Sequence, residues 1–262
     1  MNRISEKFSE AKKIKKIAFM PFFVAGDPDF KTSVEIGKLF ASLAEILEIG
    51  FPYSDPLADG PTIQAADNRA LKKGINTDKV FKLASEIRAH SEIPISILVY
   101  ANLVYQRGIE NFYRDAKKAG VDGILIPDVP VEEASPFIKA SESCGIDQIF
   151  MVTQTTTPAR LKKILSFAKG YIYIVSVLGV TGARSSFSGE VTKLIRKIKA
   201  KTSLPLAVGF GISERKHIKE LELSGADGAI VGSALVKVIE ENIDNKKELL
   251  KKLGKFVSKL KE

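Results

Sequence analysis

The chain has 262 residues, of which 45% are hydrophobic, and it carries a formal net charge of +9. A chain of this length can bury one sizeable core, and no Pro-, Gly- or Ser-rich linker divides it into two. Its single cysteine, Cys144, excludes an internal disulfide framework and any cysteine-clustered zinc or iron–sulfur site.

The first segment, Met1 to Lys16, alternates apolar residues with charges, as an amphipathic helix does. It lacks a secretory signal pattern, and Glu6 and Glu10 argue against an organelle transit peptide, which is poor in acids. No apolar run along the chain is long enough to cross a membrane. We therefore expect a cytoplasmic protein without a membrane partner.

Short apolar runs rich in β-branched residues then alternate with longer amphipathic segments. Such strands, separated by helices, indicate a parallel sheet covered on both faces. Eight of these units, in a chain close to the roughly 250 residues typical of the architecture, favour a closed (β/α)8 TIM barrel over an open sheet. The expected strands are Phe19–Ala25, Glu45–Gly50, Pro94–Tyr100, Gly123–Pro127, Gln148–Thr153, Tyr171–Val175, Pro205–Gly209 and Gly228–Val231.

Residues 1–262 are thus predicted to form a single α/β barrel domain with an additional N-terminal helix, which plugs the bottom of the barrel. A C-terminal helix, Lys246 to Leu260, is expected to pack on the outside, with a membrane-surface role as the alternative. Ala119–Ile124 and Ser224–Ala229 repeat one phrase, in which a helix-ending glycine is followed at once by a strand, and this repeat supports the βα periodicity.

The lysines are dispersed along the amphipathic helices, with no basic stripe interleaved with aromatic residues. This pattern predicts a surface that attracts small anions and no nucleic-acid partner. His90 and His217 lie in charged, helix-like stretches without ligand spacing. Both are interpreted as surface residues, and no metal site is predicted.

Glycine-rich turns follow the last strands of the predicted barrel. The segments 209–213 and 231–234 come after strands seven and eight, where barrels commonly bind phosphate through backbone N–H groups and a helix N-terminus. Ordinary tight turns are the alternative for both segments. A third glycine-rich loop, residues 179–186, has the length and polarity of a mobile lid, although an ordinary flexible loop fits the pattern as well.

Carboxylates follow the second strand. Glu48 lies at its end, where a side chain pointing into the barrel loses solvent and its pKa rises. Asp55 and Asp59 lie on the loop between Pro52 and Pro61, and either acid is also suited to capping a turn. A carboxyl with a raised pKa both gives and takes protons near neutral pH, so Glu48 is a candidate general acid and base.

These motifs together closely resemble the alpha subunit of tryptophan synthase, nearly from end to end of the chain. The loop that runs from Pro52 to Gln64 is highly specific to that family. The other matching motifs occur in the same order at compatible spacing: residues 21–28, 99–102, 128–133, 179–182 and 209–213.

The resemblance implies an enzyme that splits indole-3-glycerol phosphate into indole and glyceraldehyde 3-phosphate by a retro-aldol cleavage. Glu48 and Asp59 match the family's two catalytic carboxylates. One acid must protonate C3 of indole, while another stabilises the positive charge at the ring N–H. We assign Glu48 to C3 and the departing hydroxyl, and Asp59 to the ring nitrogen.

The resemblance extends to the binding residues. Thr181 matches a lid threonine that closes over the catalytic aspartate. The phosphate cradle is matched by Gly182, Gly211, Gly232 and Ser233, and the pocket for the flat indole ring by Phe22, Leu98, Tyr100, Leu125, Tyr173 and Phe210. Taken singly, each wall residue also fits an ordinary barrel core.

Family resemblance also implies a partner, a pyridoxal-phosphate beta subunit that receives indole through a tunnel in an αββα complex and activates the alpha subunit. No cofactor is expected in this chain itself. Pro52 and Asp55 lie on the loop that faces the partner in the family, although both also suit a plain turn. A free-standing indole-releasing lyase and a catalytically silent scaffold for a beta subunit are the alternatives, and the presence of both Glu48 and Asp59 argues against silence.

The chain departs from the family pattern at three places. Residues 42–45 lack the helix-ending glycine that usually precedes strand two, at the bottom of the barrel. Thr153-Gln154 replaces the usual Ala-Pro after strand five, and Val177-Leu178 stands in a stretch of the lid loop that is normally more polar. These changes bear on the lid and on the response to the partner.

Overall fold

The structure is a computed structural model that describes residues 2–175, 189–209 and 211–262. Eight parallel strands follow one another in chain order around a closed barrel, because β1 pairs with both β2 and β8. This confirms the predicted TIM barrel. The strands are β1 (Ala18–Val24), β2 (Leu47–Gly50), β3 (Ile95–Leu98), β4 (Gly123–Leu125), β5 (Asp147–Val152), β6 (Ile172–Val175), β7 (Leu206–Gly209) and β8 (Gly228–Val231).

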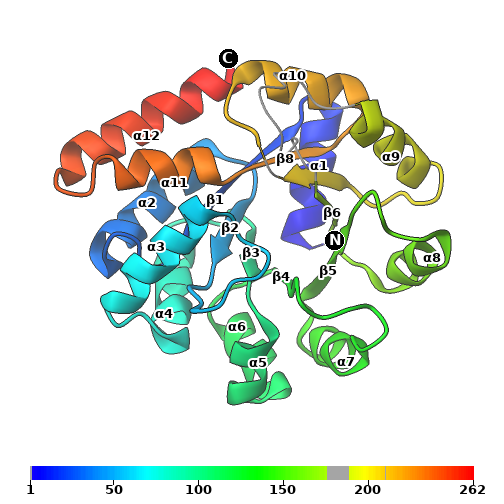
Figure 1. Cartoon of the computed structure of the whole chain (residues 1–262), viewed down its shortest axis with the longest axis horizontal. Coiled ribbons are helices and arrows are strands. Elements are labelled where there is room, and N and C mark those ends of the chain that lie inside the picture. Colours follow the sequence, from blue (N-terminus) through cyan, green and yellow to red (C-terminus); the bar gives the residue numbers. More distant parts are fainter. Residues whose placement is uncertain (1, 176–188, 210) are drawn as a thin grey trace.

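Helices surround the barrel and cover the outer faces of its strands (Figure 1). Within the described ranges the chain forms the helices α1 (Arg3–Lys13), α2 (Phe30–Leu43), α3 (Pro61–Lys72), α4 (Thr77–Arg88), α5 (Ala101–Arg107), α6 (Ile109–Lys118), α7 (Ser135–Cys144), α8 (Pro158–Phe167), α9 (Gly189–Lys199), α10 (Arg215–Ser224), α11 (Ser233–Glu240) and α12 (Lys246–Lys261). In the part of the chain that the structure describes, no helix combines the length and hydropathy that a membrane span needs.

The N-terminal helix α1 turns an apolar side toward the barrel and lies inside the ring of outer helices (Figure 1). Two strand glycines leave room for it. A Cβ atom on Gly123 would lie 2.9 Å from Ile4 Cδ1, and one on Gly228 would lie 3.1 Å from Phe8 Cε1. These glycines belong to the two repeated phrases of the sequence, so the repeat also provides space for the helix that plugs the barrel.

The aspartate of each repeated phrase fastens the neighbouring strand. Asp122 accepts a hydrogen bond from Ile95 N at 2.8 Å, and Asp227 accepts one from Leu206 N at 2.7 Å. Because strand-initiating N–H groups are costly to leave unpaired, both aspartates stabilise the lower edge of the barrel. This is a structural role that the sequence repeat did not reveal.

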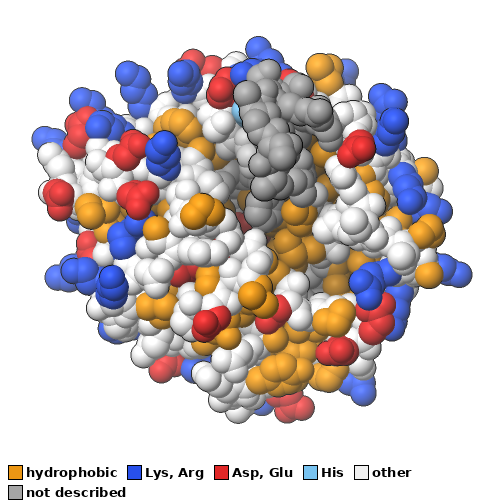
Figure 2. Space-filling view, viewed as in Figure 1, with side chains coloured by type: hydrophobic (Ala, Val, Ile, Leu, Met, Phe, Trp, Pro, Cys, Tyr) orange, Lys and Arg blue, Asp and Glu red, His pale blue; other side chains and the backbone are white. Residues whose placement is uncertain are grey.

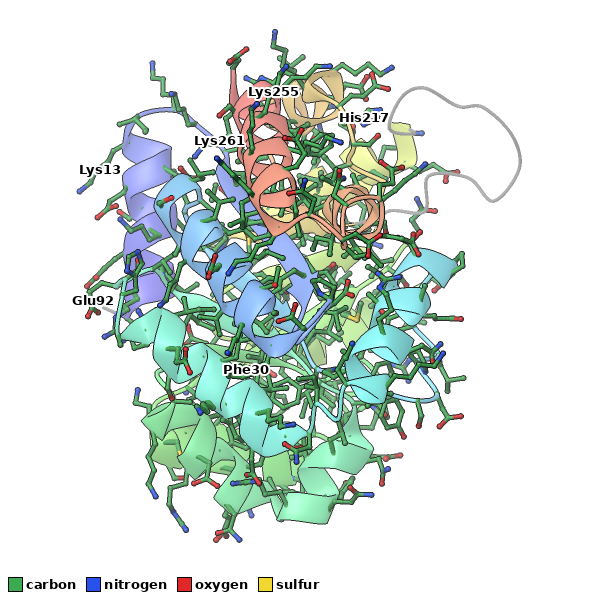
Figure 3. All side chains as sticks on the ribbon, turned by 90° about the vertical axis from the view of Figure 1, so that its left-hand side faces the viewer. Lys13, Phe30, Glu92, His217, Lys255 and Lys261 are labelled. Atoms are coloured by element: carbon green, nitrogen blue, oxygen red, sulfur yellow. The ribbon has the colours of Figure 1, made fainter. Side chains whose placement is uncertain are left out.

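The C-terminal helix α12 packs on the outside of the barrel against α2, as predicted (Figure 3). Its apolar side is buried, which leaves that side no lipid-facing role. Lys261 donates to the carbonyl oxygen of Leu43 and pairs with Glu45 at 2.9 Å. A lysine from another helix therefore satisfies the end of α2, where the family's helix-ending glycine is missing.

The prediction that His217 is a surface residue is wrong. His217, labelled in Figure 3, is only 6% exposed, and its Nδ1 accepts a hydrogen bond from Ser213 N at 3.3 Å. His217 shares the buried side of α10 with Ile218 and Leu221, so helical periodicity places it inward despite its charged neighbours. His90 is exposed, as expected.

Lys and Arg side chains are distributed around the outline of the molecule and interleaved with Asp and Glu on the face shown in Figure 2. This distribution agrees with the dispersed basic residues of the sequence. On that face the net charge of +9 is not gathered into one stripe.

Candidate active site

Glu48 lies on β2 with its side chain fully buried inside the barrel. Its Oε1 accepts a hydrogen bond from the Tyr171 hydroxyl at 3.1 Å, whereas Oε2 has no partner among the described residues. Loss of solvent raises the pKa of Glu48 to about 8; the Tyr171 hydrogen bond acts in the opposite direction, and the charge of Asp59 adds to the rise. Burial therefore favours the protonated form of Glu48 at neutral pH.

Asp59 lies on the loop that connects β2 to α3, and Tyr100 holds it there. The Tyr100 hydroxyl donates to Asp59 Oδ2 at 2.7 Å and accepts from Ala58 N at 3.0 Å. The Tyr100 ring also stacks on Tyr53, with the ring centroids 4.8 Å apart. Burial raises the pKa of Asp59, and the Tyr100 hydrogen bond limits the rise. One tyrosine at the end of β3 thus fixes three points of the loop.

A cavity of about 270 Å³ opens beside Asp59. Most of the predicted binding residues within the described ranges line it, and they come from several different strands and loops. The lining residues are Phe22, Asp59, Thr62, Ile63, Leu98, Tyr173, Gly211, Ile212, Ser213, Ile230, Gly232, Ser233, Ala234 and Lys237.

Three predicted residues lie next to this cavity without forming its surface. Glu48 is in register with the lining residue Phe22, Leu125 is in register with the lining residue Leu98, and Tyr100 reaches the cavity through Asp59. The structure thus groups Glu48, Asp59 and the predicted apolar residues at one end of the barrel, where Asp59 lines the cavity and Glu48 is fully buried beside it.

Two glycines allow aromatic rings to lie directly on the backbone at this end of the barrel. A Cβ atom on Gly50 would lie 2.6 Å from Phe22 Cζ, and one on Gly209 would lie 2.2 Å from the Tyr173 hydroxyl. Real Cβ atoms do not approach other atoms this closely, so any larger residue would displace a wall of the cavity.

The start of α11 also lines the cavity. The N-cap of that helix is Gly232, which supplies no side-chain cap, and the first helix N–H groups have no acceptor within the helix. Gly211 adds a turn with φ of +77° close by. Backbone N–H groups at a helix N-terminus favour a bound anion, so this end suits a phosphate.

Several predicted residues have no structural description. Thr181, Gly182 and Phe210 lie outside the described residues, as does the lid loop 179–186. On the partner loop, Pro52 is buried and Asp55 is exposed. The roles of all these residues stay predictions.

The sequence analysis missed three residues that shape the site. Tyr171 and Ser96 are fully buried beside Glu48 and form a hydrogen bond with each other. Asp67 is 3% exposed on α3, and burial, together with the charge of Asp59, raises its pKa to about 8. The available signals were a serine inside an apolar strand, a tyrosine two residues before Tyr173, and an acid on the apolar side of a helix.

The arrangement suits one kind of chemistry. An apolar cavity accepts a flat, uncharged body, a helix N-terminus in its wall binds an anion, and two carboxyls beside it handle protons. Since the two carboxyls have different surroundings, one can carry a proton while the other is ionised.

Comparison with known proteins places this geometry in a family. The sequence model for the tryptophan synthase alpha chain matches residues 8–262. The alpha chain from Methanoregula boonei is 50% identical over 100% of this chain and 98% of its own length. The one from Methanothermobacter thermautotrophicus is 49% identical over 93% of this chain and 91% of its own length.

Solved structures agree with the sequence matches. A chain from the tryptophan synthase a2b2 complex of the hyperthermophile Pyrococcus furiosus superposes with a TM-score of 0.88 at 40% identity, covering 93% of this chain and 97% of that one. A structure of the alpha subunit from the same organism gives a TM-score of 0.86 at 38% identity with the same coverage.

Proposed function

The chain belongs to the tryptophan synthase alpha chain family, and on that premise we propose that it cleaves indole-3-glycerol phosphate into indole and glyceraldehyde 3-phosphate. The reaction is a retro-aldol cleavage of a carbon–carbon bond. The observation that carries the proposal is the pair of carboxyls at one end of the barrel. Glu48 has a pKa raised to about 8, and Asp59 lies on the wall of the cavity.

Glu48 moves the proton in this proposal. Its neutral carboxyl donates a proton to C3 of the indole ring, which makes indole a good leaving group. The bond between C3 and the hydroxyl-bearing carbon then breaks, and the hydroxyl proton passes to the Glu48 carboxylate as the aldehyde forms. One proton has moved from oxygen to carbon, and Glu48 is again protonated. Its burial, which favours the neutral acid at pH 7, supports this assignment.

Asp59 acts at the ring nitrogen. As C3 gains a proton, positive charge develops at the ring N–H, and an ionised Asp59 accepts a hydrogen bond from it and stabilises that charge. The Tyr100 hydroxyl holds Asp59 Oδ2 at 2.7 Å, so the carboxylate need not reorient during the reaction.

The substrate lies along the cavity. Phe22, Leu98 and Tyr173 contact the indole ring, with Leu125, Tyr100 and Phe210 completing its pocket. The phosphate is bound by backbone N–H groups at Gly211, Gly232 and Ser233, together with Gly182. An apolar lining near Asp59 and an uncapped N-terminus on α11 support this orientation. Thr181 closes over Asp59 from the lid.

The partner in this proposal is a tryptophan synthase beta subunit in an αββα complex, which receives the indole. Mutual activation within an a2b2 complex is named for the Pyrococcus furiosus relative. Asp55 is exposed on the loop assigned to the partner contact, whereas Pro52 is buried and shapes that loop. Pyridoxal phosphate belongs to the beta subunit, and the cleavage described above requires only proton transfers in this chain. We place the chain in the cytoplasm, with tryptophan biosynthesis.

Indole release by the purified chain, measured with and without a beta subunit, tests the proposal. We expect release that the beta subunit stimulates strongly. Equal release in both arms would instead indicate a free-standing lyase. No release in either arm would indicate a scaffold without catalytic activity.

A further inference from the structure

Three polar side chains form a chain of hydrogen bonds inside the barrel. Ser96 on β3, Tyr171 directly before β6, and Glu48 on β2 are each fully buried. The Ser96 and Tyr171 hydroxyl oxygens are 3.0 Å apart, and the Tyr171 hydroxyl donates to Glu48 Oε1 at 3.1 Å. A phenol has one proton, so Ser96 donates to Tyr171 whenever Tyr171 donates to Glu48.

Apolar groups pack against these three hydrogen-bonded side chains. The Phe8 ring of α1 packs against the Tyr171 ring with centroids 5.8 Å apart and closes the site from below. Ser96 and Glu48 are register partners on adjacent strands, so backbone pairing holds the first and last residues of this hydrogen-bond series at a fixed separation. In a dry interior, hydrogen bonds are stronger and an altered one has a larger effect.

Among the described residues, few groups shift the pKa of Glu48. Tyr171 and Tyr173 from the β6 segment and Asp59 from the loop act on it electrostatically. Its neighbours in register, Phe22 on β1 and Ser96 on β3, carry no charge. Removal of the Ser96 hydroxyl should therefore affect the pKa of Glu48 through Tyr171.

We propose that Ser96 is a positioning residue, whose hydroxyl orients and polarises Tyr171 so that Tyr171 holds Glu48 Oε1 and leaves Oε2 to exchange the proton with the substrate. The proposal rests on the function proposed above for Glu48. It assigns different tasks to the two carboxyl oxygens. Oε1 remains an acceptor in both protonation states, and Oε2, which forms no hydrogen bond with a described residue, carries the proton.

Tyr171 itself does not ionise in this scheme. Burial raises its pKa well above its ordinary value, so it remains a donor throughout the reaction. When Glu48 becomes a carboxylate, donation from Tyr171 strengthens, and the proton that Ser96 donates to the phenol oxygen strengthens it further. Ser96 therefore favours the ionised form of Glu48, and its removal should raise the pKa of that carboxyl.

The test is a titration of the Glu48 carboxyl by carbon-13 NMR in the purified chain without substrate, alongside the pH profile of kcat/KM. Ser96→Ala should move both midpoints upward by on the order of 0.3 pH unit. KM should stay unchanged because Ser96 does not line the cavity. The value of kcat at pH 7 should fall about twofold, because a Glu48 carboxyl with a higher pKa is a weaker acid towards C3. Ser96→Thr, which keeps the hydroxyl, should restore both midpoints.

Two further variants isolate the mechanism. Tyr171→Phe should raise the midpoint by about one pH unit or more, because a hydrogen bond to the carboxylate is lost. Ser96→Ala added to Tyr171→Phe should then have no further effect. Ser141→Ala is the matched control, since Ser141 is 1% exposed and donates within α7, away from Glu48.

An unchanged Glu48 titration in Ser96→Ala would overturn the proposal, and so would an equal shift in the Tyr171→Phe background. A shifted titration in a chain that releases no indole would instead separate the two ideas: the coupling would stand, and the proposed function would fail. Circular dichroism of each variant confirms that the fold is retained.

Discussion

Among the described residues, the groups that act on Glu48 are two phenols and a second carboxyl, and none of these supplies a positive charge. In water a glutamate gives up its proton near pH 4.3. Inside the barrel the loss of solvent dominates, and the pKa rises to about 8. A glutamate thus becomes a candidate proton donor at pH 7 mainly because its place in β2 removes it from solvent.

The role of Glu48 is tested by Glu48→Gln, which keeps the shape and removes the exchangeable acid. Indole release should fall by about 10²- to 10⁴-fold, the contribution typical of general acid–base catalysis. The circular dichroism spectrum should be unchanged. Glu6→Gln, at an exposed position on α1, is the control. Near-normal release by Glu48→Gln would remove this residue from the mechanism.

At the scale of elements, the conformation of the loop after β2 is held by a residue that follows the adjacent strand β3. Tyr100 follows β3, and its hydroxyl contacts both Asp59 and the backbone of Ala58, while its ring stacks on Tyr53. The loop therefore has a defined shape although few regular hydrogen bonds cross it. Such a connection between adjacent strand ends is how a barrel turns sequence-distant residues into one site.

Tyr100→Phe should loosen this connection while keeping the ring stack. Without the hydroxyl, Asp59 loses its donor, and its pKa should rise by about one pH unit. Because Asp59 acts as a carboxylate, the acidic limb of the kcat/KM profile should move upward by the same amount, with about tenfold less indole release at pH values well below the midpoint of the unmodified chain. Tyr105→Phe, an exposed residue of α5, should leave the profile of the isolated chain in place.

The plug helix α1 contributes to stability through its apolar side. Phe8 is 4% exposed and contacts Tyr171, so Phe8→Ala should lower the free energy of unfolding by about 3–5 kcal/mol. Ile14, which is 65% exposed at the end of the same helix, provides the control. Ile14→Ala should stay within about 0.5 kcal/mol in urea unfolding. Equal losses in the two variants would mean that α1 does not close the barrel.

At the scale of the whole molecule, buried carboxyls make stability depend on pH. Glu48 and Asp67 have pKa values raised to about 8, whereas unfolded carboxyls titrate near pH 4. Between these limits the folded chain binds more protons than the unfolded chain. The free energy of unfolding should therefore decrease as the pH rises through this window.

Asp67→Asn should remove part of that dependence. The asparagine cannot ionise, so the gain in stability over the unmodified chain should be larger at pH 9 than at pH 5 by on the order of 1–3 kcal/mol. Urea unfolding at pH 5, 7 and 9 measures it. Asp244→Asn, at an exposed position, should follow the unmodified chain at every pH. Parallel curves for Asp67→Asn would contradict the burial argument.

Some features of this protein could be predicted from its sequence and others could not. The barrel, the order of its strands and the family were predicted and are confirmed, while the single-domain organisation of residues 1–262 and the individual site roles stay predictions. The surface position of His217 was predicted wrongly. Its neighbours in the sequence are charged, which suggests a surface position, but helical periodicity places His217 on the buried side of α10.

By itself the sequence determined the alternation of strands and helices, the placement of Glu48 in the second strand and of Asp59 on the loop after it, and the glycine turns near α11. These features depend on apolar periodicity and turn chemistry within short windows. Only the tertiary structure decided that Glu48 meets Tyr171, 123 residues away, that Tyr171 meets Ser96, and that Asp67 is buried. Burial and hydrogen-bond partners depend on which segments meet across the barrel, and short windows of sequence do not contain that information.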